Sequence, residues 1–274
     1  MTPETFGRIR DVIYHKLGLR FEDQKIYFLE KRIEKRMAYL NLDSEEAYAF
    51  FLRHSDPKDV EMQALANLIT TNETYMFREF EQLQAFSDYC LPDVISRKVK
   101  AGDRTLNIWS AGCSSGEEAY TLAIILREVI HDFSRWKITI TGSDIDQERL
   151  QMAQTAVYDD RAVKEVPAEY FDRHIYRDRK DYRIAPETKE MVDFIHLNLN
   201  DRLAMRRMTN YDFVFCRNVL IYFDDESRRS AVEHFYHALN KGGYIFLGHS
   251  DSIRRITNAF LLRRVGGHLV YYKE

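Results

Sequence analysis

The sequence predicts an α/β fold, in which a mostly parallel sheet carries helices on both faces and follows a small all-helical domain. From Leu106 onward, short apolar runs of strand length alternate with longer segments of helical periodicity. Residues 1–80 show helical periodicity alone. Two apolar runs joined by Gly266–Gly267 close the chain and predict an antiparallel hairpin at one edge of the sheet.

The composition limits the classes to which this chain can belong. It has 274 residues, of which 45% are hydrophobic and 30% charged, as in an ordinary globular protein. The net charge of −3 provides no overall basic field, so we expect no nucleic-acid partner. No apolar run approaches the length of a membrane span, and the first residues contain no apolar signal core. We therefore expect a cytoplasmic protein that does not insert into a membrane.

Cysteine and histidine usage gives no sign of a metal or disulfide framework. The three cysteines, Cys90, Cys113 and Cys216, are odd in number and widely spaced, which is consistent with a reducing compartment. The nine histidines show no ligand spacing. We expect no bound metal.

The helices of residues 1–80 follow from apolar residues at helical spacing, such as Phe6, Ile9 and Ile13 in the first. The expected helices are Glu4–Leu17, Asp23–Leu40, Asp43–His54, Pro57–Ile69 and, leading into the sheet domain of residues 81–274, Glu79–Lys100. The second helix carries two basic rows, because Lys31 and Lys35 are four residues apart, as are Arg32 and Arg36. A solvated face balanced by neighbouring glutamates is the simpler interpretation, and a docking patch for an acidic helical partner is the alternative.

The junction between the two domains, Thr70–Glu79, combines three hydroxyls, an amide, two aromatic rings and an arginine. Thr71 or Asn72 could simply cap a helix, since both are preferred capping residues. However, domain junctions are also favoured places for ligand sites.

The central motif is Leu106–Tyr120, which predicts a strand, a glycine loop and the start of a helix. Gly112 and Gly116 allow the sharp turns and leave room for a ligand against the backbone. The loop lacks the G-x-G-x-x-G fingerprint, and the helix opens with Glu117 and Glu118, which would repel a pyrophosphate. A ligand with hydroxyls and positive charge fits better, such as a nucleoside carrying a sulfonium and an ammonium group.

The next strand, Lys137–Gly142, runs into Ser143–Asp146. A carboxylate at this position can accept hydrogen bonds from both ribose hydroxyls of a nucleoside in the glycine loop. We expect Asp144 to bind the ribose and Asp146 to cap the following helix, Gln147–Ala156.

The rest of the chain completes the alternation. A charged, tyrosine-rich stretch contains a short hairpin or loop at Tyr176–Ile184. The other expected elements are the strands Val192–Leu197, Tyr211–Cys216 and Tyr244–Gly248, a helix Asp224–Asn240 stopped by Lys241–Gly243, and the hairpin Phe260–Val265 with His268–Tyr272. Dehydrogenases and class I methyltransferases share this architecture, so the fold alone does not fix the function.

Four blocks in this order and spacing resemble the CheR family of chemotaxis receptor methyltransferases. They are Thr70–Glu79, Ser110–Tyr120, Ser143–Asp146 and Phe215–Asp224, and Gly242–Gly243 followed by Gly248–Ser250 also matches. The resemblance covers nearly the whole chain. It implies a class I methyltransferase sheet and S-adenosylmethionine-dependent O-methylation of glutamates on the cytoplasmic helical bundle of chemoreceptors, with S-adenosylhomocysteine as product.

The family's roles fall on matching positions of this sequence. The cofactor-binding residues implied are Asn72, Thr74, Arg78, Gly112, Glu118 at the methionine end, Asp144 at the ribose, Asn198 and Leu199 at the adenine, and Asn218 and Val219. The basic helix with Lys31, Arg32, Lys35 and Arg36 would dock on the receptor. The insert at about residues 172–192 would be the β-subdomain with which some members bind a receptor C-terminal peptide, and it is short here. Ser115 and Ala119 stand where the family usually has threonine and proline. We expect a monomer.

Methylation of a carboxylate requires no strong base, because the acceptor is already ionised at neutral pH. The rate should come from alignment of the reacting atoms and exclusion of water. Arg78 and Tyr222 are the side chains expected nearest the reacting centre, although Tyr222 could equally serve packing. A non-catalytic scaffold that binds the cofactor is the alternative function, and a nicotinamide dehydrogenase is disfavoured by the missing fingerprint.

Overall fold

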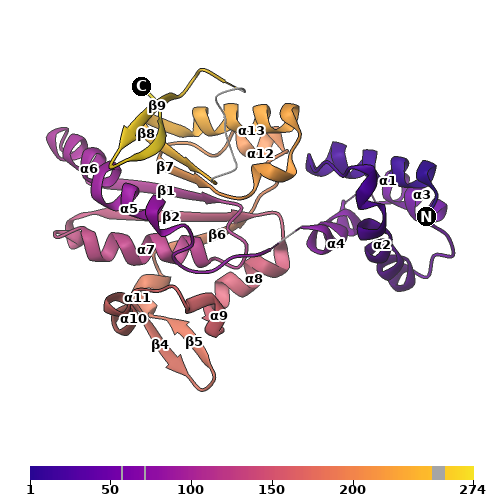
Figure 1. Ribbon diagram of the computed structural model, residues 1–274, viewed down its shortest axis with the longest axis horizontal. Coiled ribbons are helices and arrows are strands. Elements are labelled where there is room, and N and C mark those ends of the chain that lie inside the picture. Colours follow the sequence, from indigo (N-terminus) through magenta and orange to yellow (C-terminus); the bar gives the residue numbers. More distant parts are fainter. Residues whose placement is uncertain (57, 71, 249–256) are drawn as a thin grey trace.

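The N-terminal part of the computed structural model is a group of four helices, shown in indigo and violet in Figure 1. The structure describes residues 1–56, 58–70, 72–248 and 257–274. The helices are α1 (Pro3–Leu17), α2 (Ile26–Leu40), α3 (Glu45–His54) and α4 (Val60–Ile69). Thr2 and Ser44 cap α1 and α3 by accepting hydrogen bonds from backbone N–H groups. The expected start of the fourth helix, Pro57, lies outside the described residues.

A seven-stranded sheet forms the centre of the second domain, with strand order β6-β2-β1-β7-β8-β10-β9. The strands are β1 (Thr105–Ala111), β2 (Lys137–Asp144), β6 (Val192–His196), β7 (Tyr211–Cys216), β8 (Leu239–Leu247), β9 (Leu261–Val265) and β10 (His268–Tyr272). The first five are parallel, and β10 runs antiparallel to both β8 and β9. This arrangement confirms the predicted parallel sheet with a closing antiparallel hairpin.

The two faces of the sheet carry different hydrophobic clusters, because successive strand side chains point to opposite faces. On β7, Phe213 and Phe215 pack with α5 (Phe80–Ala85), α6 (Leu91–Lys100) and α7 (Glu117–Val129). Val214 and Cys216 face the other side, with α12 (Arg202–Met205) and α13 (Asp225–Ala238), and their hydrophobic cluster continues into the four N-terminal helices, which lie beyond the end of the sheet in Figure 1. The helical domain therefore shares a hydrophobic core with one face of the sheet.

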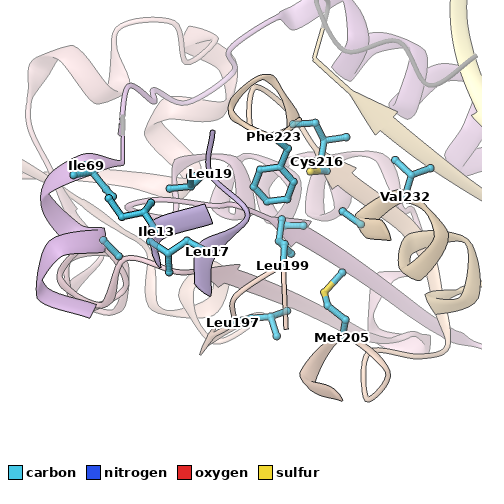
Figure 2. Packing of buried hydrophobic residues seen from close by; sticks show 14 of the residues in the cluster. Ile13, Leu17, Leu19, Ile69, Leu197, Leu199, Met205, Cys216, Phe223 and Val232 are labelled. Carbon is cyan, nitrogen blue, oxygen red and sulfur yellow. The ribbon is translucent and has the colours of Figure 1, made fainter. Parts of the chain in front are cut away.

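Figure 2 shows that shared core at close range. The labelled side chains from the helical part are Ile13, Leu17, Leu19 and Ile69, and those from the sheet domain are Leu197, Leu199, Met205, Cys216, Phe223 and Val232. Polar contacts flank it. Tyr14 donates a hydrogen bond to Asp224 (2.8 Å), and Leu19 forms a β-bridge with Phe223. The predicted domain boundary at residue 80 stays a prediction.

An insert between β2 and β6 forms a second, smaller sheet, seen at the bottom of Figure 1. The predicted hairpin is present as β4 (Ile175–Asp178) and β5 (Asp181–Ile184). The prediction missed a third strand, β3 (Val157–Tyr158), which pairs with β5 and is too short to show a period. The insert also contains α9 (Asp160–Val163), α10 (Ala168–His174) and α11 (Pro186–Lys189), and α8 (Gln147–Thr155) precedes it.

Two of the predicted helices need correction. The second helix begins at Ile26, after a 3₁₀ turn over Asp23–Lys25. The expected helix Glu79–Lys100 is divided by a π-helical turn, Phe86–Cys90. Pro92 explains this division, since it has no N–H with which to continue the α-helical hydrogen bonds.

The predicted helix stop at Lys241–Gly243 is instead an irregularity within a strand. The preceding helix, α13, ends at Ala238, and β8 begins at Leu239, which pairs with Tyr211. The pairing resumes between Phe213 and Tyr244, so residues 240–243 bulge from the ladder. Gly243 suits this place because a Cβ there would lie 2.9 Å from the carbonyl oxygen of Asp212. The predicted Gly248–Ser250 match lies partly outside the described residues.

Candidate active site at the domain junction

A cavity of about 800 Å³ opens where the glycine loop, the ends of β2, β6 and β7, the domain junction and the α1–α2 linker meet. A volume of this size suits a nucleoside-like ligand together with part of a second substrate. Its lining includes every residue predicted to bind the cofactor or to lie near the reacting centre, namely Asn72, Thr74, Arg78, Gly112, Glu118, Asp144, Asn198, Leu199, Asn218, Val219 and Tyr222. Residues far apart in the sequence thus share one site.

The glycine loop begins with a turn that only glycine fits. Gly112 has a φ of 79°, and a Cβ at this position would collide with a methyl group of Val219. The N–H groups of Gly112 and Cys113 both donate to the carbonyl of Ser143, at 2.7 and 2.9 Å. The loop is therefore held between the ends of β2 and β7.

Asp144 lies at the end of β2 and is almost fully buried. One carboxylate oxygen accepts the Ser114 N–H (2.7 Å), and the other accepts the Asp146 N–H (2.9 Å). Burial raises the pKa of Asp144, and these backbone hydrogen bonds oppose the shift. Each carboxylate oxygen has a further lone pair, so the group can still accept hydrogen bonds from ligand hydroxyls.

Asp146 caps the helix that follows β2, as predicted from the sequence. Its side chain accepts the N–H of Arg149 (3.1 Å) and caps α8. It also accepts a hydrogen bond from the side-chain amide of Asn72 (2.8 Å), whose oxygen in turn accepts from the Ser114 hydroxyl (3.3 Å). Asn72 therefore connects the junction segment with both the glycine loop and the end of β2. Thr71 lies outside the described residues.

Glu118 faces the cavity from the first turn of α7. The hydroxyl of Ser110 donates to one of its oxygens (2.6 Å), and the guanidinium of Arg217 donates to the other (3.2 Å). Burial raises the pKa of Glu118, whereas the charge of Arg217 and the Ser110 hydrogen bond lower it. The result is a buried acidic group whose two oxygens are held in a fixed orientation at the cavity.

Arg217 is a site residue to which the sequence analysis gave no role, although it lies inside one of the matching blocks. Its side chain is only 4% exposed. Besides Glu118, it donates to Glu79 (3.3 Å) and to the backbone carbonyl of Arg78. The sequence signal that could have found it is an arginine directly after a buried strand, at the edge where the other site residues gather.

Arg78 and Tyr222 both line the cavity. Arg78 lies in the domain junction, and Tyr222 lies in the segment that follows β7. Arg78 is half-buried and donates to the carbonyl of Glu73 (2.6 Å), so its side chain remains within the junction. Tyr222 is 36% exposed, and its backbone carbonyl accepts the Arg20 N–H (3.2 Å). The Tyr222 side chain is therefore accessible from the cavity, and its predicted place near the reacting centre stays a prediction.

Asn198 lines the cavity but also joins the two domains. Its side-chain amide donates to the carbonyl of Lys16 (2.8 Å), and Asn200 makes a similar bond to His15 (3.3 Å). Both carbonyls are at the C-terminal end of α1, where backbone acceptors lack helical partners. Leu199 is buried in the shared core.

Comparison with known proteins identifies the architecture. Residues 4–70 match the family described as CheR methyltransferase, all-alpha domain, and residues 72–265 match CheR methyltransferase, SAM binding domain. The chain belongs to the CheR methyltransferase family. The resemblance predicted from four blocks is thereby confirmed, and so is S-adenosylmethionine as the cofactor.

Relatives of this CheR chain cover most or all of its length. It is 38% identical over 274 residues to chemotaxis protein methyltransferase 2 of Vibrio cholerae, covering 100% of this chain and 94% of the relative. It is 31% identical over 273 residues to the chemotaxis protein methyltransferase of Escherichia coli, covering 97% and 89%. The corresponding Borreliella burgdorferi protein is 30% identical over 256 residues, covering 93% and 90%.

The donor set of this CheR site fits S-adenosylmethionine. Glu118 offers a negative charge to a cationic amino-acid group, and Asp144 offers acceptors for ribose hydroxyls. Gly112 leaves the space that any side chain would fill. Cys113 also lines the cavity, but burial raises its pKa well above its usual range, so it is not a reactive thiolate.

Within residues 1–56, 58–70, 72–248 and 257–274, no three metal-ligating side chains cluster together. Over the same residues, no helix has the length and apolar character needed to cross a membrane.

Proposed function

We propose that this CheR protein transfers a methyl group from S-adenosylmethionine to glutamate side chains of a chemoreceptor's cytoplasmic domain. The products are a glutamate methyl ester and S-adenosylhomocysteine. The observation that carries the proposal is that one cavity is lined by three charged side chains from different elements: Glu118 after the glycine loop, Asp144 at the end of β2 and Arg78 in the domain junction. The family match makes methyl transfer the chemistry of that cavity.

In this proposal, Asn72, Gly112, Glu118, Asp144 and Val219 form the cofactor half of the cavity. When bound, S-adenosylmethionine would supply an electrophilic methyl group for transfer to a carboxylate oxygen, with the electron pair of the carbon–sulfur bond left on sulfur. Arg78 orients a carboxylate, and Tyr222 helps to exclude water from the reacting oxygen. No general base is assigned, because a glutamate is ionised at neutral pH.

The proposed docking surface for the receptor is the exposed side of α2. Lys31 and Lys35 are exposed there, and Tyr27 and Tyr39, which continue the same row in steps of four residues, are each 74% exposed. A cationic row with aromatic ends suits an acidic helical partner.

Arg32 and Arg36, which the sequence analysis placed in the same patch, are occupied within the helical domain. Arg32 donates to the carbonyls of Leu68 and Phe28, both at 2.9 Å. Arg36 forms a two-pronged ion pair with the buried Glu61, at 2.9 and 2.6 Å. These contacts favour a structural role for both arginines, and we restrict the proposed surface to Lys31 and Lys35. A cytoplasmic location and a monomeric state complete the proposal.

The test is incubation of the protein with methyl-labelled S-adenosylmethionine and a receptor cytoplasmic fragment. We expect base-labile label on glutamates of the fragment. Binding of S-adenosylhomocysteine in calorimetry without any label transfer would instead indicate a cofactor-binding scaffold. Binding of NAD and not of S-adenosylhomocysteine would overturn the proposal altogether.

A further inference from the structure

We propose that Arg217 is a positioning residue for methyl transfer, which holds the Glu118 carboxylate and the Arg78–Glu79 backbone in fixed relation to each other. Through the first contact it would keep Glu118 ready for the cofactor's ammonium group. Through the second it would keep the Arg78 side chain at the reacting end of the cavity. This inference rests on the proposed function and adds a residue to it.

The geometry places Arg217 at the crossing of three elements. It follows β7 directly, and one terminal nitrogen donates to Glu118 on α7 (3.2 Å). The other terminal nitrogen donates to the Arg78 carbonyl and to Glu79 (3.3 Å), both in the junction. A guanidinium is planar and rigid, so two groups bound to its ends are fixed relative to each other, which a flexible lysine could not achieve.

The charges around Glu118 show why this contact affects ligand binding. Arg217 and Arg78 lower the pKa of Glu118, whereas burial and the neighbouring charge of Glu79 raise it, and the Ser110 hydroxyl bonds its ionised form. Cys113, a further titratable neighbour, is held neutral by burial. Removing Arg217 would leave the buried Glu118 carboxylate beside that of Glu79 without the guanidinium between them, so the pKa of Glu118 would rise further. A protonated Glu118 does not attract an ammonium group.

A purely architectural role for Arg217 predicts a different outcome. If the side chain only supported the fold, its loss would lower stability and affinity equally at every pH. The proposal instead predicts a pH-dependent loss of affinity that disappears when Glu118 can no longer titrate.

The experiment is calorimetric titration of the full chain with S-adenosylhomocysteine between about pH 5.5 and 8.5, a range over which a raised carboxyl pKa becomes visible. For Arg217→Ala we expect at least a tenfold loss of affinity near neutral pH and partial recovery as the pH rises. In Arg217→Ala with Glu118→Gln, the affinity should stay low and independent of pH. An affinity that falls by the same factor at all pH values in Arg217→Ala would overturn the proposal.

Arg97→Lys is the control variant. The Arg97 guanidinium also bonds one carboxylate, that of Asp93, and one backbone carbonyl, that of Gly242, but it does not line the cavity. Its replacement should leave the pH dependence of binding unchanged.

If Arg217→Ala does not fold, Arg217→Lys is the test variant, because lysine keeps the positive charge but lacks the two rigidly linked terminal nitrogens. We expect Arg217→Lys to bind the cofactor within about threefold of wild type and to lose at least tenfold in kcat. An unchanged kcat would overturn the proposal. Failure of the wild-type chain to bind S-adenosylhomocysteine would count against the proposed function itself.

Discussion

Gly112 and Val219 lie in direct contact across the cofactor site, so close that a Cβ on Gly112 would overlap a Val219 methyl group. The two residues come from different blocks of the sequence, at the ends of β1 and β7. Their contact sets the width of the glycine loop and, with it, the space left for a ligand.

Substituting Gly112 therefore tests the loop. Gly112→Ala should weaken binding of S-adenosylhomocysteine at least tenfold, because the new methyl group displaces Val219 and the left-handed φ of 79° becomes strained. Gly102→Ala is the matched control, since Gly102 has a φ of 72° but nothing within 4 Å of a Cβ. It should cost about 1–2 kcal/mol of unfolding free energy and leave calorimetric affinity unchanged. Equal affinities for both variants would contradict the assignment of Gly112.

Glu117 should make the protein less stable as the pH rises. Its side chain is buried, and burial raises its pKa to about 7 from an ordinary value of 4.5. Between these values the folded state binds more protons than the unfolded state, so the free energy of unfolding falls with increasing pH, by up to about 3 kcal/mol. Glu117→Gln should therefore raise the melting temperature at pH 8 and change it little near pH 5. A uniform shift across this range would contradict the prediction.

Asn198 combines a place in the cavity with a bond to α1, and a pair of variants separates these roles. Asn198→Ala and Asn200→Ala each remove one hydrogen bond to an α1 carbonyl, which should cost about 0.5–1.5 kcal/mol in unfolding free energy. Asn198→Ala should cost more than Asn200→Ala, because the Asn198 side-chain oxygen also accepts the Asn200 N–H (2.9 Å). Only Asn198 lines the cavity. We expect S-adenosylhomocysteine affinity to fall in Asn198→Ala alone, and an equal fall in both would mean that Asn198 acts through the interface.

Arg78→Ala tests the residue expected nearest the reacting centre. Removing a guanidinium that orients a carboxylate should reduce kcat/KM by about 10²-fold, in line with other electrostatic contacts of active sites. Calorimetry with S-adenosylhomocysteine tells which carboxylate is held, because only a cofactor contact lowers that affinity. Unchanged turnover together with unchanged affinity would remove Arg78 from the mechanism.

Charge reversal on α2 tests the proposed receptor surface. Lys31→Glu with Lys35→Glu should reduce the rate of receptor methylation about tenfold or more at low ionic strength, with a smaller effect at high salt. S-adenosylhomocysteine affinity should not change, since neither lysine lines the cavity. Lys100→Glu, on the exposed end of α6, is the control for added negative charge. An equal loss of rate in the control would argue against a local docking surface.

The alternating architecture and the glycine loop follow from the sequence, because strand ends and glycine turns are local signals, whereas roles such as those of Asn198 and Val219 are implied by the resemblance to the CheR family. Asp144 and Asp146, for example, could be given separate tasks from their places at a strand end and a helix start. The partners of long polar side chains could not be predicted in this way. Arg36 is adjacent to exposed lysines in the sequence, yet it bonds Glu61, and the period of a helix does not reveal which neighbour will satisfy a buried charge.

The same limit explains the errors in the sheet domain. The two-residue strand β3 has no period, and its pairing depends on β5, about 25 residues further along the chain. Gly242 and Gly243 carry the composition of a helix stop, but the strand begins before them because Leu239 finds a partner in Tyr211. Arg217 gained its importance from Glu118 and Glu79, which lie 99 and 138 residues earlier in the chain.

The shared core between α1 and the sheet has a consequence for how the chain folds during synthesis. Tyr14 and its partner Asp224 are 210 residues apart, so at usual rates of translation α1 leaves the ribosome about 10–40 s before Asp224 is made. During that interval Ile13 and Leu17 lack their partners in the sheet domain. The N-terminal helices are thus the first part of the chain to be made and among the last to reach their final packing, and a cell with slowed translation would prolong the exposure of their apolar faces.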